Sequence, residues 1–161
     1  MVLENRFNKL IEARHGTILY NKNDIYIGKS IEKYGEFSYL EAKIFEQICK
    51  AGDVVIEVGA NIGAHTLYLS KLVGNGYVFA FEPQRLVFQN LCANLALNSI
   101  SNVFAYQEAV SNENGTIIIP ECNFKENNNF GGINIENTKN GTTVNKQKLD
   151  NFLNKIDRLK L

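Results

Sequence analysis

The stretch from residue 54 to residue 66 constrains the fold of this chain more than any other. It opens with an apolar, mostly β-branched run over 54–58, which is typical of a strand buried on both faces of a sheet. Gly59 and Gly63 interrupt the run, and apolar residues return at helical spacing from Leu67 to Val73. Strand, glycine turn and helix form the first half of a βαβ unit, whose turn lets a ligand lie against bare backbone. The sequence therefore predicts an α/β fold with a ligand site here.

Two acidic residues bracket this turn. Glu57 interrupts the apolar strand two positions before the first glycine, and Glu82 ends the next apolar run, 19 residues after Gly63. An acid at this spacing, at the tip of the second parallel strand, accepts hydrogen bonds from two ribose hydroxyls. A carboxylate buried alone at residue 57 would cost several kcal/mol, so Glu57 needs a partner, and the ammonium group of a ligand would serve.

The residue between the two glycines separates two classes of nucleotide. A dinucleotide site has the pattern G-x-G-x-x-G, in which the middle glycine clears the pyrophosphate. Asn61 occupies that place here, and its side chain would crowd a diphosphate. S-adenosylmethionine carries an amino acid and an adenosine but no phosphate, so the pattern favours this methyl donor over NAD. The alternative is a glycine turn that only joins a strand to a helix.

Composition excludes several classes of function. The chain has 161 residues, with 17 basic and 17 acidic side chains and no basic block, which argues against a nucleic-acid or membrane-surface partner. No apolar run reaches the 18 residues of a membrane span, and residues 1–11 lack a signal-peptide pattern, so we expect a cytoplasmic protein. Three widely spaced cysteines predict free thiols rather than a disulfide framework or a zinc site.

The N-terminal third predicts a small region of its own. Residues 1–14 have apolar side chains at helical spacing, which indicates a short helix or an arm. Residues 17–20 and 25–27 flank a turn signal and predict a β-hairpin. We place a boundary after residue 36, with the arm and hairpin before it and a partial Rossmann-like domain over 37–161. Tyr34 and Glu36 lie in a predicted loop, where they are either over the ligand or solvated.

The elements after residue 37 follow an α/β order. Ser38 and Glu41 fit a capping box for a helix that ends near Gly52. A helix follows Pro83, and a third strand over 103–110 places Glu108 and Ala109 at the carboxyl edge of the sheet, where adenine could bind. Residues 115–120 predict an edge strand, the Asn-rich segment 121–143 a loop, and residues 149–156 a helix. Within the loop, residues 130–132 form a substrate wall or are disordered.

Several of these motifs together resemble an FkbM-type methyltransferase. The resemblance is carried by E-V-G-A-N-I-G-A-H-T over 57–66, by F-E-P over 81–83, by Y-G-E-F over 34–37, and by N-F-G-G over 129–132. It implies a Rossmann-like class I enzyme that depends on S-adenosylmethionine and methylates an oxygen of a sugar or other small metabolite. By that resemblance Glu82 would hold the ribose. The methionine end would be held by Glu57, Gly59, Ala60, Asn61 and Gly63.

The chain departs from this family in length. In the family, a segment like 148–152 is followed by a strand resembling I-K-I-D-V-E-G, whereas this sequence stops at Leu161. The sequence thus predicts three parallel strands, the donor-binding half, with the second half of the sheet missing. A sheet cut beside its first strand exposes an apolar edge. We therefore expect a fragment, a homodimer or a chain completed by a partner.

Three functional readings follow from these observations. The first is a methyltransferase acting on a small-molecule or sugar acceptor; His65, Tyr34 and Glu36 are the candidates for its general base. The second is a non-catalytic donor-binding or assembly module that has lost the acceptor half. The third, an NAD-dependent dehydrogenase, is disfavoured by Asn61.

Overall fold

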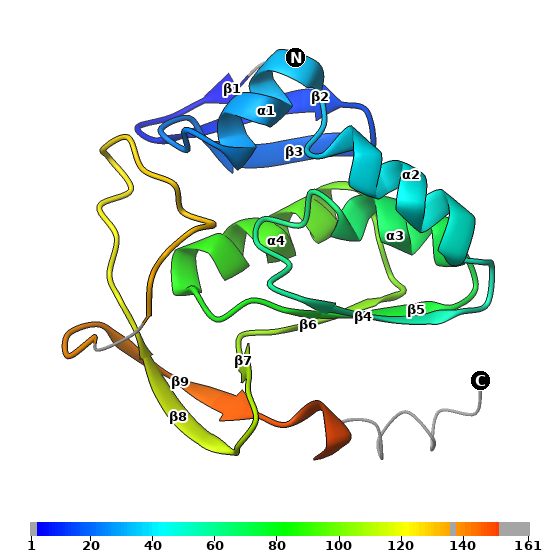
Figure 1. Ribbon diagram of the computed structural model, residues 1–161. Coiled ribbons are helices and arrows are strands. Elements are labelled where there is room, and N and C mark those ends of the chain that lie inside the picture. Colours follow the sequence, from blue (N-terminus) through cyan, green and yellow to red (C-terminus); the bar gives the residue numbers. More distant parts are fainter. Residues whose placement is uncertain (1–2, 136–137, 152–161) are drawn as a thin grey trace.

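The computed structural model describes residues 3–135 and 138–151 as an α/β protein (Figure 1). A small antiparallel sheet lies at the N-terminus, a parallel sheet lies at the centre, and a third sheet follows it along the chain. The elements, in chain order, are β1 (Leu3–Glu4), β2 (Asn8–Ala13), β3 (Gly16–Asn21), α1 (Ile27–Tyr34), α2 (Tyr39–Ile48), β4 (Val54–Val58), α3 (Thr66–Val73), β5 (Tyr77–Phe81), α4 (Arg85–Leu97), β6 (Val103–Tyr106), β7 (Ala109–Val110), β8 (Gly115–Ile119) and β9 (Thr142–Gln147).

The central sheet confirms the predicted run of three parallel strands. Its order is β4-β5-β6, with Ile56 opposite Phe79 and Phe79 opposite Phe104. Helices α3 and α4 cover one face (Figure 1). On that face Val78 packs with α3, while Phe79 on the other face packs with Ile56. This is the strand, helix, strand, helix, strand core of a Rossmann-like fold.

The prediction that β4 is buried on both faces is wrong. Its residues are only partly buried, and Val58 is 54% exposed. Among residues 3–135 and 138–151, β4 pairs with β5 alone, so it is an edge strand of the sheet. The strand buried on both faces is β5, whose residues 78–81 are all buried because β5 lies between β4 and β6.

The N-terminal prediction is also wrong. Residues 3–13 form strands β1 and β2 instead of a helix or an arm, and β2 pairs with β3 through a turn at Arg14 and His15. Residues 25–27 do not form a strand but lead into α1. The carboxylate of Asp24 accepts the N–H groups of Tyr26 (2.9 Å) and Ile27 (3.2 Å), so it caps the start of this helix.

Two asparagines, one within α4 and one directly after it, attach the N-terminal sheet to this helix. Asn98 accepts the N–H of Thr17 (2.9 Å) and donates to its carbonyl (2.6 Å), and Asn94 does the same for Leu19 (2.6 and 3.0 Å). These residues are one turn apart on the helix and two apart on the strand, so the amides act as a substitute partner for β3. The domain boundary after residue 36 stays a prediction, although Ile18 shares a core with Leu91.

Helix α2 differs from its prediction at both ends. Ser38 has a left-handed backbone (φ 50°) and its side chain makes no capping bond, while Glu41 turns toward His65 instead, so the capping box is wrong. The helix ends at Ile48, before Gly52. Three apolar side chains of this helix are largely exposed: Leu40 is 74%, Ile44 is 52% and Ile48 is 65% accessible.

The predicted strand 103–110 is broken at residues 107 and 108 into β6 and β7, which belong to different sheets. β8 confirms the predicted edge strand, while the polar strand β9 replaces the end of the predicted loop. Of the predicted C-terminal helix, residues 149–151 are helical and residues 152–156 lie outside the described residues. The part of the chain that the structure describes contains no helix long and apolar enough to cross a membrane.

Candidate functional site

The glycine turn after β4 holds its shape through its own backbone. The N–H groups of Gly59 and Ala60 both donate to the carbonyl oxygen of Phe81, each at 2.9 Å, and the N–H of Gly63 donates to the carbonyl of Ala60 at 2.9 Å. Three of the donors that a glycine turn could offer to a ligand are therefore used inside the protein.

Asn61 uses the remaining donors of the turn. It has a left-handed backbone (φ 52°), a conformation that asparagine adopts more readily than most residues. Its N–H donates to Glu82 at 3.0 Å, and its side-chain oxygen accepts the N–H of Ile62 at 2.8 Å. The five N–H groups from residue 59 to residue 63 are thus all engaged within the protein.

The two glycines of the turn serve different purposes. Both have positive φ angles, +78° at Gly59 and +85° at Gly63. A Cβ added at Gly63 would lie 2.7 Å from Cδ1 of the buried Leu91, so this glycine allows α4 to pack closely. A Cβ added at Gly59 would meet no atom within 4 Å. The space beside Gly59 is therefore open to a ligand.

Glu57 lies on β4 beneath this turn. Its carboxylate accepts a hydrogen bond from the hydroxyl of Thr66 at 2.7 Å, a partner supplied by the first residue of α3. Burial raises the pKa of Glu57 to about 7, and the bond from Thr66 offsets only part of that effect. One neutral donor leaves this carboxylate without a compensating positive charge among its described contacts.

Glu82 follows β5 directly and lies beside the turn. It is 3% exposed and accepts the N–H groups of Asn61 (3.0 Å) and Gln84 (2.8 Å). Burial raises its pKa to about 7, while the two backbone donors lower it. The structure therefore brings Glu57, Glu82 and the glycine turn together at the carboxyl ends of β4 and β5, where open α/β sheets hold their ligands.

A segment that is distant in sequence covers the same region. The side-chain amide of Gln84 donates to the carbonyl oxygen of Phe130 at 2.7 Å. Phe130 is 2% exposed and stacks on Phe124 at a centroid distance of 4.6 Å. A Cβ added at Gly131 would lie 3.3 Å from the amide nitrogen of Asn61. Residues 130–132, the predicted substrate wall, are thus ordered beside the turn.

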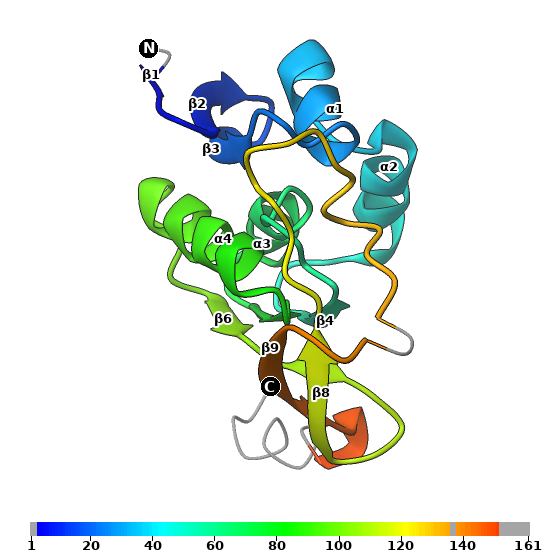
Figure 2. The same ribbon diagram turned by 90° about the vertical axis from the view of Figure 1, so that its left-hand side faces the viewer.

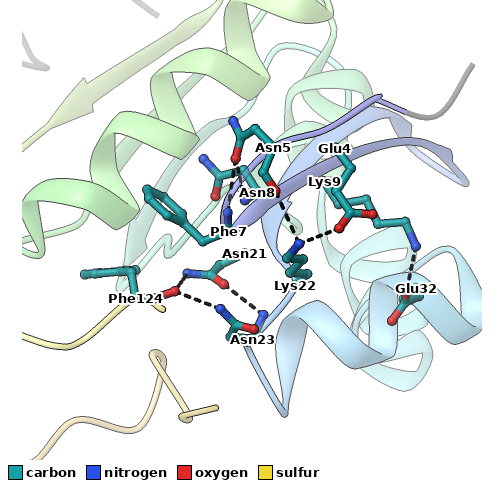
Figure 3. A network of polar contacts seen from close by, with 10 residues as sticks. All are labelled: Glu4, Asn5, Phe7, Asn8, Lys9, Asn21, Lys22, Asn23, Glu32 and Phe124. Carbon is teal, nitrogen blue, oxygen red and sulfur yellow. Dashed lines mark hydrogen bonds and ion pairs between the residues drawn. The ribbon is translucent and has the colours of Figure 1, made fainter. Parts of the chain in front are cut away.

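The turn before α1 anchors this segment from the other side. The amide nitrogens of Asn21 and Asn23 donate to the carbonyl of Phe124 at 2.9 and 3.0 Å (Figure 3). The N–H of Ile25 donates to the carbonyl of Asn128 at 3.0 Å. The sequence predicts no role for Gln84, Asn21 or Asn23 at this site. The one sequence signal among them is the position of Gln84, two residues after Glu82.

None of the contacts described for Tyr34 and Glu36 is with the glycine turn, Glu57 or Glu82. Glu36 is buried, lies 3.2 Å from the guanidinium of Arg14 and 3.7 Å from Nε2 of His15, and lines a small cavity of about 10 Å³. Burial is the largest effect on His15 and lowers its pKa, so this contact is not an ion pair at neutral pH. Tyr34 is 60% exposed at the end of α1. Their roles at the ligand site stay predictions.

The sequence predicts Glu108 and Ala109 inside the strand 103–110, but the structure ends β6 at Tyr106 and attaches both residues to β9. The side chain of Gln147 donates to the carboxylate of Glu108, and Ala109 pairs with Lys146. The N–H of Glu82 donates to the carbonyl of Tyr106 at 3.0 Å, so this corner adjoins the site. A contact with adenine stays a prediction for both residues.

His65 lies just before α3, two residues after Gly63. Its Nε2 is 2.8 Å from the Glu41 carboxylate, and its ring contacts Phe37 and Phe45 at centroid distances of 5.5 and 5.2 Å. These contacts hold the imidazole in place. They leave its role as a general base a prediction.

A cavity of about 120 Å³ lies at the start of α4. Its walls combine apolar and polar side chains from the start of α4 and the residue before it, from the end of β8, from the loop that follows and from the start of β9: Gln84, Arg85, Leu86, Ile119, Pro120, Glu121, Cys122, Phe124 and Thr142. The cavity therefore shares Gln84 with the site around Glu82. Among the described residues, no group of three or more His, Cys, Asp and Glu side chains could hold a metal ion.

Comparison with known proteins supports this fold and suggests a class. No family model matches the chain. Residues of the chain are 32% identical over 89 positions to "Methyltransferase sdnD" of Sordaria araneosa, which covers 51% of this chain and 34% of that protein. They are 29% identical over 65 positions to "Methyltransferase 1" of Beauveria bassiana, covering 40% and 26%. The matched segments thus span about a third or less of these relatives.

A solved structure shares the fold at low identity. TYW2 of M. jannaschii, crystallised in complex with AdoMet, matches 68% of this chain and 53% of its own, with a TM-score of 0.51 and 18% identity. At this identity the match shows the fold alone. Together with the β4-β5-β6 order it establishes an α/β, Rossmann-like architecture.

Proposed function

We propose that this chain binds S-adenosylmethionine and forms the donor-binding part of a methyltransferase. The observation that carries the proposal is a glycine turn whose own N–H groups are all engaged within the protein and which lies beside two carboxylates, the buried Glu82 and the half-buried Glu57. The two curated relatives named as methyltransferases support the same class.

The engaged N–H groups favour a ligand without phosphate. A dinucleotide site holds its pyrophosphate with backbone N–H groups that point at the ligand. Here residues 59–63 direct theirs to Phe81, Glu82 and the turn itself. The carboxylates of Glu57 and Glu82 beside the turn would also repel a diphosphate. Both observations oppose an NAD-dependent dehydrogenase.

The residues present fit the parts of the methyl donor. Glu57 can exchange its single neutral partner, Thr66, for an ionic contact with the ammonium group of a ligand. Glu82 would accept the two ribose hydroxyls, and the open space beside Gly59 would admit the ligand to the backbone. Bound S-adenosylmethionine would supply an electrophilic methyl group on its sulfonium sulfur.

At a finer level we propose an FkbM-type enzyme that methylates an oxygen of a sugar or other small metabolite. The support is the set of three motifs over 57–66, 81–83 and 129–132. In the structure these three segments lie next to one another. Amide side chains are plentiful in residues 127–129, and amides are suitable partners for hydroxyl groups.

The edge position of β4 supports a second candidate function. β4 pairs with β5 alone among residues 3–135 and 138–151, and Val58 at its end is 54% exposed. An unprotected strand edge is a template for another strand. We therefore also consider a non-catalytic donor-binding module, which a second copy or a partner chain completes through β4.

Isothermal titration with S-adenosylhomocysteine tests the proposal. We expect the wild-type chain to bind it and to bind NADH weakly or not at all. Glu57→Gln and Glu82→Gln should each weaken binding by about tenfold or more, since hydrogen bonds to charged groups are worth about 1.5–3 kcal/mol. The matched control, Glu126→Gln, changes an exposed glutamate and should bind as the wild type does. A folded wild-type chain that gives no heat with S-adenosylhomocysteine would remove the proposal.

A further inference from the structure

The loop between β8 and β9 runs from the third sheet toward α1 and the N-terminal sheet before it returns (Figures 1 and 2), and its residue 131 lies against Asn61 of the glycine turn. Resting on the function proposed above, we propose that residues 128–132 form the third wall of the donor pocket and that Gln84 is the positioning residue that holds this wall. The first two walls are the glycine turn after β4 and the carboxylate after β5.

Gln84 connects the second wall to the third. Its backbone N–H donates to Oε1 of Glu82 at 2.8 Å, and its side-chain amide donates to the carbonyl oxygen of Phe130 at 2.7 Å. One residue therefore contacts both the carboxylate assigned to the ribose and the backbone of the loop. A change in the Gln84 side chain alters the position of the loop without removing a group that would touch the ligand.

The loop is also held from the opposite side, by the turn before α1, so the bond from Gln84 adds a second point of attachment. The carbonyl of Phe124 accepts the amides of Asn21 and Asn23, and Asn128 forms backbone hydrogen bonds with residues 23 and 25 (Figure 3 for Phe124). Phe130 is 2% exposed and stacks on Phe124. Gln84 is the contact in this set that comes from the donor-binding side of the molecule.

Gly131 brings the loop against the turn. A Cβ at this position would lie 3.1 Å from Cδ1 of Ile27 and 3.3 Å from Nδ2 of Asn61, both tighter than ordinary contact. The absence of a side chain at residue 131 therefore lets the loop approach Asn61, in the middle of the turn. A larger residue would push the third wall away from the first.

Gln84 directly precedes α4. The test compares Gln84→Met with Gln89→Met, which makes the same change at an exposed position within that helix. Titration with S-adenosylhomocysteine should show about tenfold weaker binding for Gln84→Met, and wild-type affinity for Gln89→Met, at equal melting temperatures. A readout of the loop itself is tryptic cleavage after Lys125. S-adenosylhomocysteine should slow this cleavage in the wild type and should protect Gln84→Met much less.

Each outcome bears on the proposal. Wild-type affinity and protection in Gln84→Met would overturn the third wall while the proposed function stands. No binding by the wild-type chain would overturn both. Should Gln84→Met fail to fold, Gly131→Ala replaces it: about tenfold weaker binding supports the wall, and unchanged binding overturns it.

Discussion

The side-chain amide of Asn94 donates to the carbonyl oxygen of Ile62 at a distance of 2.7 Å. The same side chain pairs with the N–H and the carbonyl of Leu19. Asn94 is fully buried on α4, so one amide joins the glycine turn, the helix and the N-terminal sheet. The position of the turn therefore depends on a residue that lies outside the ligand site.

We predict that Asn94→Ala lowers the free energy of unfolding by about 2–4 kcal/mol. The substitution leaves the backbone groups of Leu19 and the carbonyl of Ile62 buried without partners, and each such group costs about 1–3 kcal/mol. Urea unfolding followed by circular dichroism measures the loss. Asn90→Ala on the same helix is the control and should cost less than about 1 kcal/mol; equal losses for the two variants would contradict the role of Asn94.

Stability should fall as the pH rises from about 4.5 to about 7. Burial raises the pKa of Glu57 and of Glu82 to about 7 from an ordinary 4.5. Below pH 4.5 both states are protonated and the full stability is present. Between 4.5 and 7 the unfolded chain ionises while the folded chain keeps its protons, so stability declines, by on the order of 3 kcal/mol for each carboxyl, and then levels off.

Thermal or urea unfolding across this pH range measures the decline. Glu57→Gln and Glu82→Gln should each flatten the curve, because an amide does not titrate. The doubly substituted chain should lose this decline, and the lowered pKa of His15 should then make its stability rise slightly as the pH approaches 6.5. A wild-type stability that rises over this interval would show that the carboxyls are ionised in the folded chain.

Affinity for S-adenosylhomocysteine should increase with pH up to about 7. Glu57 must lose its proton to pair with an ammonium group, and its pKa of about 7 makes this costly at lower pH. We expect the dissociation constant to rise about tenfold per pH unit below 7 for each carboxyl that must ionise. Titrations from pH 5.5 to 8.5 measure the slope. The slope should fall by one in Glu57→Gln; an unchanged slope would assign the effect to another group.

The two glycines of the turn should respond differently to alanine. Gly63→Ala places a Cβ against the buried Leu91 and adds a strained φ, so we predict a loss of about 2–4 kcal/mol in stability. Gly59→Ala meets open space and should cost only the strain of about 1–2 kcal/mol, but should weaken binding of S-adenosylhomocysteine. Melting temperatures and titrations on both variants separate the effects; equal binding by Gly59→Ala and the wild type would place the ligand elsewhere.

The central fold could be predicted because its signals are local. A buried apolar run, glycines at a fixed spacing and an apolar helical stripe occur within a few residues of one another between 54 and 97. Each element there keeps its predicted type, and the boundaries shift by one or two residues. The pairing of Glu57 and Glu82 at one edge followed from the rule that parallel strands end at the same edge.

The remainder depends on contacts between distant segments. β9, from Thr142 to Gln147, is polar and forms a strand because β8 and β7 flank it. The strands before residue 14 carry apolar residues three and four apart, which a helix would also explain. The hydrogen bond between Gln84 and Phe130 joins residues that are 46 positions apart, so no local sequence pattern predicts it. From the sequence alone, residues 130–132 are therefore predicted to be either a wall or disordered.

The engaged N–H groups of the turn have a thermodynamic consequence for recognition. Because residues 59–63 already satisfy one another and Glu82, the turn needs no rearrangement when a ligand arrives. Binding then costs little conformational entropy in this turn, because the turn is already preorganised for the ligand. Selectivity between ligands must then come from the charges and the shape around a fixed backbone, and not from a conformational change of the turn on binding.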